Sequence, residues 1–176
     1  ILEGEALHED RIGGKGHLHA GDIQWMTAGR GIVHQEMPVR GGPPLRGIQL
    51  WVNLPARLKM TAPRYQDIRG EEIPEETCQN GSIRVIAGQF EDTRGVVQTH
   101  LPITYLDIRL SAGGAVDIPL PKDANAFAYI IEGEALFSED EFPGSHPELL
   151  VFSKGETLSL RSKTGSRILL IAAEPL

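Results

Sequence analysis

The chain has few cysteines, few aromatic residues and no excess of basic residues, and each shortage excludes a class of protein. It contains one cysteine, Cys78, so an internal disulfide is excluded and a reducing, cytoplasm-like compartment is expected. Aromatic residues make up 6% of the 176 residues, and no apolar run is long enough to span a bilayer. Acidic residues outnumber basic ones by 24 to 17, for a net charge of -7. Direct nucleic-acid binding, which needs a basic surface, is therefore not expected.

Long amphipathic helices are also missing, and short β-patterned segments take their place. Such segments lie at Ile48–Leu54, Ile83–Ile86 and Tyr105–Leu110, between frequent glycine and proline breaks. The best helical candidate is the short stretch Ala56–Met60. A chain of this length can bury one core of good size or two small ones. The pattern predicts an all-β protein built as a sandwich or barrel.

An internal repeat indicates that one β unit occurs twice. The segment Ile1–Leu7 recurs at Ile130–Leu136 with a single difference in seven positions. Downstream, the Gly21-Asp22 pair of the first copy is echoed by Gly155-Glu156. Two copies of one β unit imply a pair of jelly rolls.

The connection between the two copies is expected in the irregular region Gln89–Gln98. We therefore predict an N-terminal domain over residues 1–92 and a C-terminal domain over residues 93–176.

The strongest functional signal lies between Gly21 and Pro38. His34 and Glu36 stand two apart in a β pattern, and such residues point to the same face of a strand. An imidazole and a carboxylate on one face suit zinc, or a non-haem Fe(II) or Mn(II) centre with open positions. His34 and Glu36 are therefore the predicted metal ligands. A His-x-Glu pair is common by chance, so it indicates a metal site only together with the residues around it.

Those surrounding residues resemble the second cupin motif as it occurs in the pirin family. The resemblance covers Gly21–Pro38, with its Gln-Trp-Met-Thr-Ala-Gly run and His-x-Glu-Met-Pro ending. It continues through Gly47–Leu54, Glu71–Pro74 and Ala173–Leu176. The resemblance implies a bicupin, that is, two jelly-roll β-barrel domains of the cupin superfamily.

The two copies are not expected to be functionally equal. Counted from the equivalent glycine, the position of His34 is taken in the second copy by Ile168, within an apolar run. We therefore expect one metal site, in the N-terminal domain, and a metal-free C-terminal domain. The pirin resemblance implies the same asymmetry.

Relative to the pirin family, the chain is expected to be truncated at both ends. The family completes its iron site with a His-x-His pair on a strand before the Leu2–Gly4 position, so the N-terminal domain is expected to lack its first strands. His17 and His19 form a local His-x-His pair that offers an alternative set of ligands with His34 and Glu36. The family pattern instead favours solvent-facing positions for them.

Other residues with functional associations have simpler explanations. His8 is expected to be a polar surface residue near the end of the first strand. Gly29–Gly31 is expected to form a turn, since no helix follows to bind a phosphate. Trp25 and Trp51 are expected in the core more often than in a pocket. Gln49 is a candidate pocket residue on the segment after the metal motif.

The resemblance implies an enzyme or a regulator. The enzyme would be a quercetin-type flavonol 2,3-dioxygenase that consumes O2 and uses Fe(II), although Mn, Ni, Cu, Zn and Co are alternatives. Its metal would be held by His34 and Glu36, and Glu36 would also take the proton of the flavonol 3-hydroxyl. The regulator would bind a transcription factor in a metal-dependent or redox-dependent way, in the nucleus if the source is eukaryotic. A sugar isomerase or another small-molecule binder is a third alternative, and a monomer is expected.

Overall fold

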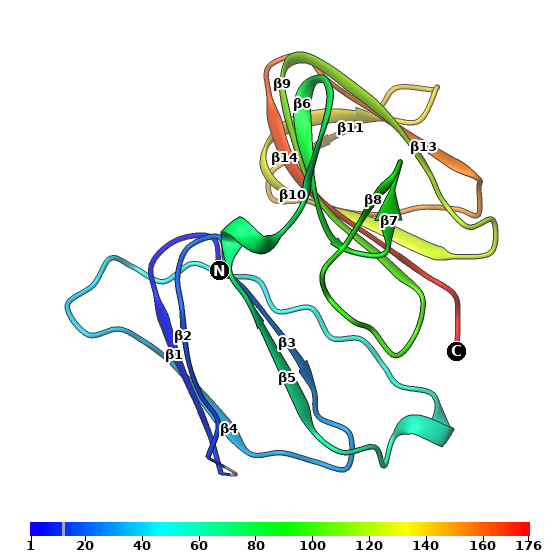
Figure 1. Cartoon of the computed structure of the whole chain (residues 1–176). Coiled ribbons are helices and arrows are strands. Elements are labelled where there is room, and N and C mark those ends of the chain that lie inside the picture. The colour runs from blue at the N-terminus through cyan, green and yellow to red at the C-terminus, as the bar shows by residue number, and fades with distance from the viewer. Residues whose placement is uncertain (12) are drawn as a thin grey trace. The chain divides into compact units, whose positions relative to one another are not determined.

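The computed structural model describes residues 1–11 and 13–176, and these are almost entirely β-structure (Figure 1). The strands are β1 (Ala6–Asp10), β2 (Lys15–Leu18), β3 (Ile23–Thr27), β4 (His34–Pro38), β5 (Arg64–Ile68), β6 (Glu75–Ala87), β7 (Gln89–Phe90), β8 (Thr93–Arg94), β9 (Ile103–Pro119), β10 (Asn125–Phe137), β11 (Phe142–Ser145), β12 (Leu149–Val151), β13 (Thr157–Ser162) and β14 (Ser166–Ala173). Two 3₁₀ turns, η1 (Ala56–Leu58) and η2 (Gly70–Glu72), complete the elements. The all-β prediction is confirmed. In the described part of the chain, no helix has the length and hydrophobicity required to cross a membrane.

The chain divides into two compact units. The first consists of Ile1–Glu72 with Leu176, and the second of Ile73–Pro175. This division lies earlier than the sequence-based boundary between residues 92 and 93. The difference arises from β6, which pairs with β9 in the second unit, for example Ile83 opposite Ile108.

The second unit is a sheet that curls back on itself. β10 pairs with β13, β13 with β9, β9 with β14, and β14 again with β10, so the order returns to its first strand. β11 and β12 extend the sheet from β10, and β6 extends it from β9. The Ile83–Ile86 and Tyr105–Leu110 strands predicted from the sequence are confirmed within β6 and β9.

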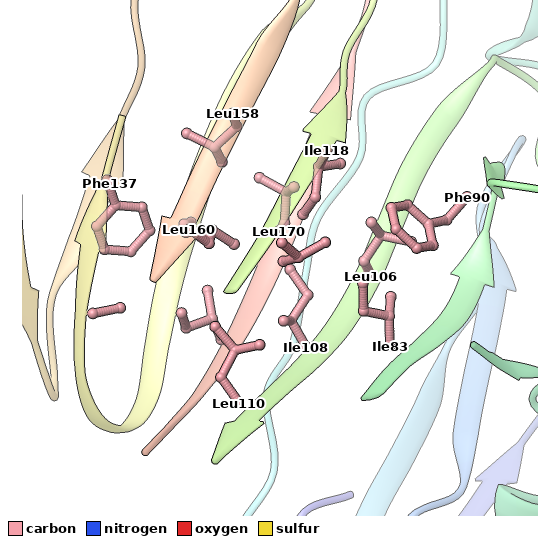
Figure 2. Packing of buried hydrophobic residues seen from close by; sticks show 14 of the residues in the cluster. Ile83, Phe90, Leu106, Ile108, Leu110, Ile118, Phe137, Leu158, Leu160 and Leu170 are labelled. Atoms are coloured by element: carbon pink, nitrogen blue, oxygen red, sulfur yellow. The ribbon is translucent and has the colours of Figure 1, made fainter. Parts of the chain in front are cut away.

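The enclosed side chains form a large apolar core (Figure 2). Its labelled members come from strands far apart in the sequence: Ile83, Phe90, Leu106, Ile108, Leu110, Ile118, Phe137, Leu158, Leu160 and Leu170. Burying each such side chain stabilises the fold by roughly 1.5–3 kcal/mol relative to an exposed one. Ile168, which takes the place of His34 in the second copy, is fully buried in this core.

The first unit contains two smaller sheets. One has the order β2-β1-β4, and the other pairs β3 with β5. The rings of His8 on β1 and Tyr65 on β5 lie 4.7 Å apart, so the two sheets meet at these residues. Ala6 and Leu18 are buried in this unit. The face of the β2-β1-β4 sheet that carries His8 therefore packs against β5 of the other sheet.

The segment Ile48–Leu54 does not form the strand predicted from its alternating pattern. It is irregular, and Trp51 is 90% exposed, so the expectation of a core position for Trp51 is also wrong. Alternation supplies side chains for two faces, but a strand also needs a partner for its backbone hydrogen bonds. The predicted helix at Ala56–Met60 is present as the shorter 3₁₀ turn η1.

The glycine of the repeated Leu/Ile-Glu-Gly-Glu motif has a similar positive φ in both copies. Gly4 has φ of +74° and Gly133 has φ of +70°, a region that side chains rarely adopt. A Cβ added at Gly133 would collide with the backbone oxygen of Gly165, and one at Gly4 would lie 2.7 Å from the Pro44 oxygen. The glycine is therefore required for backbone conformation and close approach.

Replacing Gly133 by alanine should lower the free energy of unfolding of the second unit by at least about 2 kcal/mol, because left-handed strain and the collision add. Urea denaturation followed by circular dichroism measures this change. Gly155→Ala is the matched control, since no atom of the described residues lies within 4 Å of a Cβ added at Gly155, and it should shift stability by less than about 0.5 kcal/mol. Equal effects of the two substitutions would contradict this account.

The Gly21-Asp22 turn is held by a buried carboxylate. Asp22 accepts hydrogen bonds from the backbone N–H groups of His19 (2.9 Å) and Gly70 (2.8 Å) and from the Arg69 guanidinium (2.8 Å). Burial alone would raise the pKa of Asp22, but these three donors outweigh it and lower the pKa below its ordinary value.

A lowered folded-state pKa makes the stability of this unit depend on pH. The stabilisation from Asp22 is complete above the unfolded-state pKa and is lost as the pH falls through the lower folded-state pKa. The free energy of unfolding of the first unit should therefore decrease below about pH 4. Asp22→Asn should be less stable at pH 7 and show a flatter profile in urea denaturation between pH 3 and 7. A parallel profile in the variant would contradict this role.

Candidate metal site

The pairing of β1 with β4 assembles the candidate site. In this antiparallel register His8 lies opposite Glu36, and Asp10 lies opposite His34. Residues directly opposite share a face, as do residues two apart on one strand. His8, His34 and Glu36 therefore lie on one face of the sheet, and the predicted same-face arrangement of His34 and Glu36 is confirmed by β4.

These three side chains form a compact donor group, which we call the β1–β4 cluster. One ligand atom from each of His8, His34 and Glu36 lies within 4.8 Å of the others. His34 Nδ1 is 4.0 Å from Glu36 Oε1, and the rings of His8 and His34 have centroids 5.3 Å apart. Two imidazoles and one carboxylate are the donor set typical of non-haem Fe(II) centres.

The expectation that His8 is a polar surface residue is wrong. It is 2% exposed rather than a surface residue. Neither ring nitrogen has a hydrogen-bond partner among the described residues. A buried imidazole with two unsatisfied nitrogens is costly, and a metal ion would satisfy one of them. The cluster therefore fits a divalent cation.

His8 was missed because its neighbours in sequence, Glu9 and Asp10, are polar. The sequence shows that His8 and Asp10 are two residues apart and so share a strand face. It does not show that β1 pairs with β4, which sets His8 opposite Glu36. Gly16 lies opposite His8 on β2 and carries no side chain, so nothing from that strand covers the imidazole. The ring of Tyr65 covers it instead.

The environment keeps Tyr65 in its neutral form. Burial, together with the nearby negative charge of Asp10, raises the pKa of the Tyr65 phenol. The ring centroids of Tyr65 and His8 lie 4.7 Å apart. Tyr65 therefore acts as a wall of the cluster.

Gln49 lies next to the predicted ligand Glu36. Its Nε2 donates a hydrogen bond to Glu36 Oε2 at 2.9 Å. The side chains of His34 and Glu36 are 30% and 37% exposed, so the cluster is open to solvent on one side. Gln49 thus orients the carboxylate at the open side.

His17 and His19 do not join the β1–β4 cluster. His17 lies opposite Leu7, whose side chain faces away from that of His8, and the two histidines group with Glu5 instead. Both are exposed, as the sequence analysis expected.

The Gly29–Gly31 segment forms the expected turn. The Gly31 N–H donates to the Ala28 carbonyl, and the Arg30 N–H donates to the Thr61 carbonyl. Trp25 is half-buried within β3.

Known proteins match this chain along its length. The family model described as pirin matches residues 1–52, and that of the pirin C-terminal cupin domain matches residues 105–176. A pirin-like protein of Solanum lycopersicum is 41% identical over 179 residues, which cover 100% of this chain and 61% of the relative. A putative quercetin 2,3-dioxygenase of Pseudomonas aeruginosa is 41% identical over 184 residues, which cover 100% of this chain and 64% of that protein.

A solved structure agrees with the fold. Quercetin 2,3-dioxygenase from Acinetobacter baumannii has a TM-score of 0.90 and 30% sequence identity, and the match covers 99% of this chain and 62% of that chain. The chain thus spans less than two thirds of the length of these relatives. The expected cupin fold is confirmed by the family model and by this structure. On these matches, the chain belongs to the pirin family.

Proposed function

We propose that the protein containing this chain is a flavonol 2,3-dioxygenase of the quercetinase type, with one iron ion held by His34 and Glu36. The observation that carries the proposal is the β1–β4 cluster, in which a buried imidazole with unsatisfied nitrogens meets an imidazole and a carboxylate. His8 is the third donor within reach. The similarity to a putative quercetin 2,3-dioxygenase supports the substrate class.

The donor set supports Fe(II) among the divalent metals that the family implies. Two histidines and one carboxylate leave positions open for substrate, as in non-haem iron oxygenases. The same donors accept Mn, Ni, Cu, Zn or Co, so loading with each metal belongs in the assay. A bound divalent metal with open positions supplies Lewis acidity toward the flavonol 3-hydroxyl and its neighbouring carbonyl.

Glu36 is the proposed general base. Gln49 holds Glu36 Oε2 through its 2.9 Å hydrogen bond, while Glu36 Oε1 lies on the side of His34. A carboxylate at the open side of the cluster can accept the proton of the 3-hydroxyl as the substrate arrives. His34 and Glu36 would hold the metal with His8 as the third donor, and Tyr65 would exclude water behind His8.

The test is turnover of quercetin by the whole natural protein, measured as O2 consumption and CO release. Glu36→Gln should reduce turnover by more than about 100-fold, because general-base catalysis contributes about 10²–10⁴-fold. Gln49→Ala should reduce it less, since it removes only the orienting hydrogen bond. Glu139→Gln, an exposed carboxylate in a turn of the second unit, is the control and should not change the rate.

A second function accounts for the same metal site without turnover. The pirin resemblance implies a regulator that binds a protein partner, and an acidic chain with net charge -7 suits protein partners better than DNA. A protein that binds metal through His34 and Glu36 but consumes no O2 with quercetin would overturn the enzyme proposal in favour of this one.

A further inference from the structure

A second donor group of the same composition lies elsewhere in the first unit. One ligand atom from each of Glu5, His17 and His19 lies within 4.8 Å of the others. The proposed dioxygenase function does not use these residues. We infer that they form a second divalent-metal site, which takes a borderline cation such as Zn²⁺.

The strand register separates this group from the β1–β4 cluster. Leu7 on β1 lies opposite His17 on β2, so these two side chains share a face, and Glu5, just before β1, places its Oε2 2.6 Å from His17 Nε2. His8 is one residue beyond Leu7 and faces the other way. The two donor groups therefore lie on opposite faces of β1, and one ion cannot be shared between them.

The distances suit a small cation. Glu5 Oε2 is 2.6 Å from His17 Nε2 and 3.6 Å from His19 Nδ1, and the two imidazole rings have centroids 4.3 Å apart. In a tetrahedral zinc site with bonds of about 2.1 Å, neighbouring ligand atoms stand about 3.4 Å apart. A small rotation of the Glu5 carboxylate opens the shorter distance to that value. Three protein ligands then leave one position for water.

The backbone that carries the two histidines is fixed. The His17 carbonyl accepts a hydrogen bond from Arg69 Nη1 at 2.8 Å. The His19 N–H donates to Asp22 Oδ2 at 2.9 Å, and the His19 carbonyl accepts from the Asp22 N–H at 3.0 Å. The ligands are therefore presented on a rigid strand end and turn, which reduces the entropy lost on metal binding.

A simple ion pair is the competing explanation. The side chains are 38–49% exposed, and exposed pairs of this kind contribute little to stability. One pair would account for Glu5 with His17, but it gives no role to His19, whose ring also approaches the same carboxylate oxygen. A cation explains why all three converge.

The experiment is calorimetric titration of the 176-residue chain with Zn²⁺. The variant His34→Ala/Glu36→Ala removes ligands of the β1–β4 cluster and isolates the second group. This background should bind one equivalent of Zn²⁺, and adding His17→Ala or His19→Ala should weaken that binding by at least about 10-fold. His100→Ala, an exposed histidine of the second unit, is the control and should leave the affinity unchanged.

A parallel titration uses the wild-type chain, in case the double substitution disturbs folding. Wild-type protein should bind two equivalents of Zn²⁺, and His17→Ala/His19→Ala should bind one. Absence of Zn²⁺ binding in the isolating background, or binding that is insensitive to both histidines, would overturn the second site. Neither result depends on flavonol turnover, so failure here is separate from failure of the proposed function.

Discussion

Replacing His34 by alanine is expected to weaken divalent-metal binding at the β1–β4 cluster by more than about 100-fold. Loss of an outer partner of a ligand typically costs 10–100-fold in affinity, and loss of the ligand itself should cost more. His34 supplies one of three donors within 4.8 Å of one another. Without it, Glu36 and the buried His8 would leave the cation mostly bound to water.

The measurement is competition with a chelator of known affinity, made in the His17→Ala/His19→Ala background to remove the second group. Gln35→Ala is the matched control, because Gln35 lies between His34 and Glu36 on β4 and donates to Glu9 at 3.1 Å, on the opposite face. The control should bind metal like its parent. Equal losses for His34→Ala and Gln35→Ala would show that the strand, rather than the imidazole, is responsible.

Replacing Asp107 by alanine is expected to lower the free energy of unfolding of the second unit by about 3–5 kcal/mol, the cost of breaking a buried ion pair. Asp107 is 3% exposed, and its two oxygens accept from Arg167 Nε at 3.0 Å and Arg167 Nη2 at 2.8 Å. The hydrogen bond from Arg167 to Asp107 is also the main cause that raises the pKa of Arg167. Removing the carboxylate would leave a buried guanidinium without its principal counter-charge.

Urea denaturation of the wild type and Asp107→Ala measures this loss. Asp117→Ala is the control, since Asp117 is exposed on the same strand β9, and it should change stability by less than about 0.5 kcal/mol. The double variant Asp107→Leu/Arg167→Met should recover part of the loss, because it removes the guanidinium that Asp107 binds most closely; Arg84, which lies 3.4 Å from Asp107 Oδ2, still loses that contact. A double variant less stable than Asp107→Ala would contradict the buried-charge explanation.

The sequence predicted those features that depend on local pattern. Alternation and frequent glycine were enough for the all-β class, and the two-residue spacing of His34 and Glu36 was enough to place them on one face. The repeated motif predicted two copies of one β unit, and its glycine, Gly4 in one copy and Gly133 in the other, has a similar positive φ in both. Each of these conclusions requires only short stretches of sequence and no knowledge of which strands pair.

Features that depend on pairing between distant segments were not predictable. His8 joins the cluster because β1 pairs with β4 in a register that sets it opposite Glu36. The Ile48–Leu54 segment has the side-chain alternation of a strand but is irregular, and its Trp51 is exposed. The division of the chain between Glu72 and Ile73 follows from the pairing of β6 with β9. A one-residue shift in any register would change which side chains meet.

The claim that His34 and Glu36 hold a divalent metal is tested most directly by anomalous diffraction from crystals grown with Fe(II) under anaerobic conditions. The account predicts an anomalous peak at the iron edge about 2.0–2.2 Å from an imidazole nitrogen of His34 and a carboxylate oxygen of Glu36. His8 should lie next to the same peak. A peak at Glu5, His17 and His19 alone, or none within bonding distance of His34 and Glu36, would contradict it.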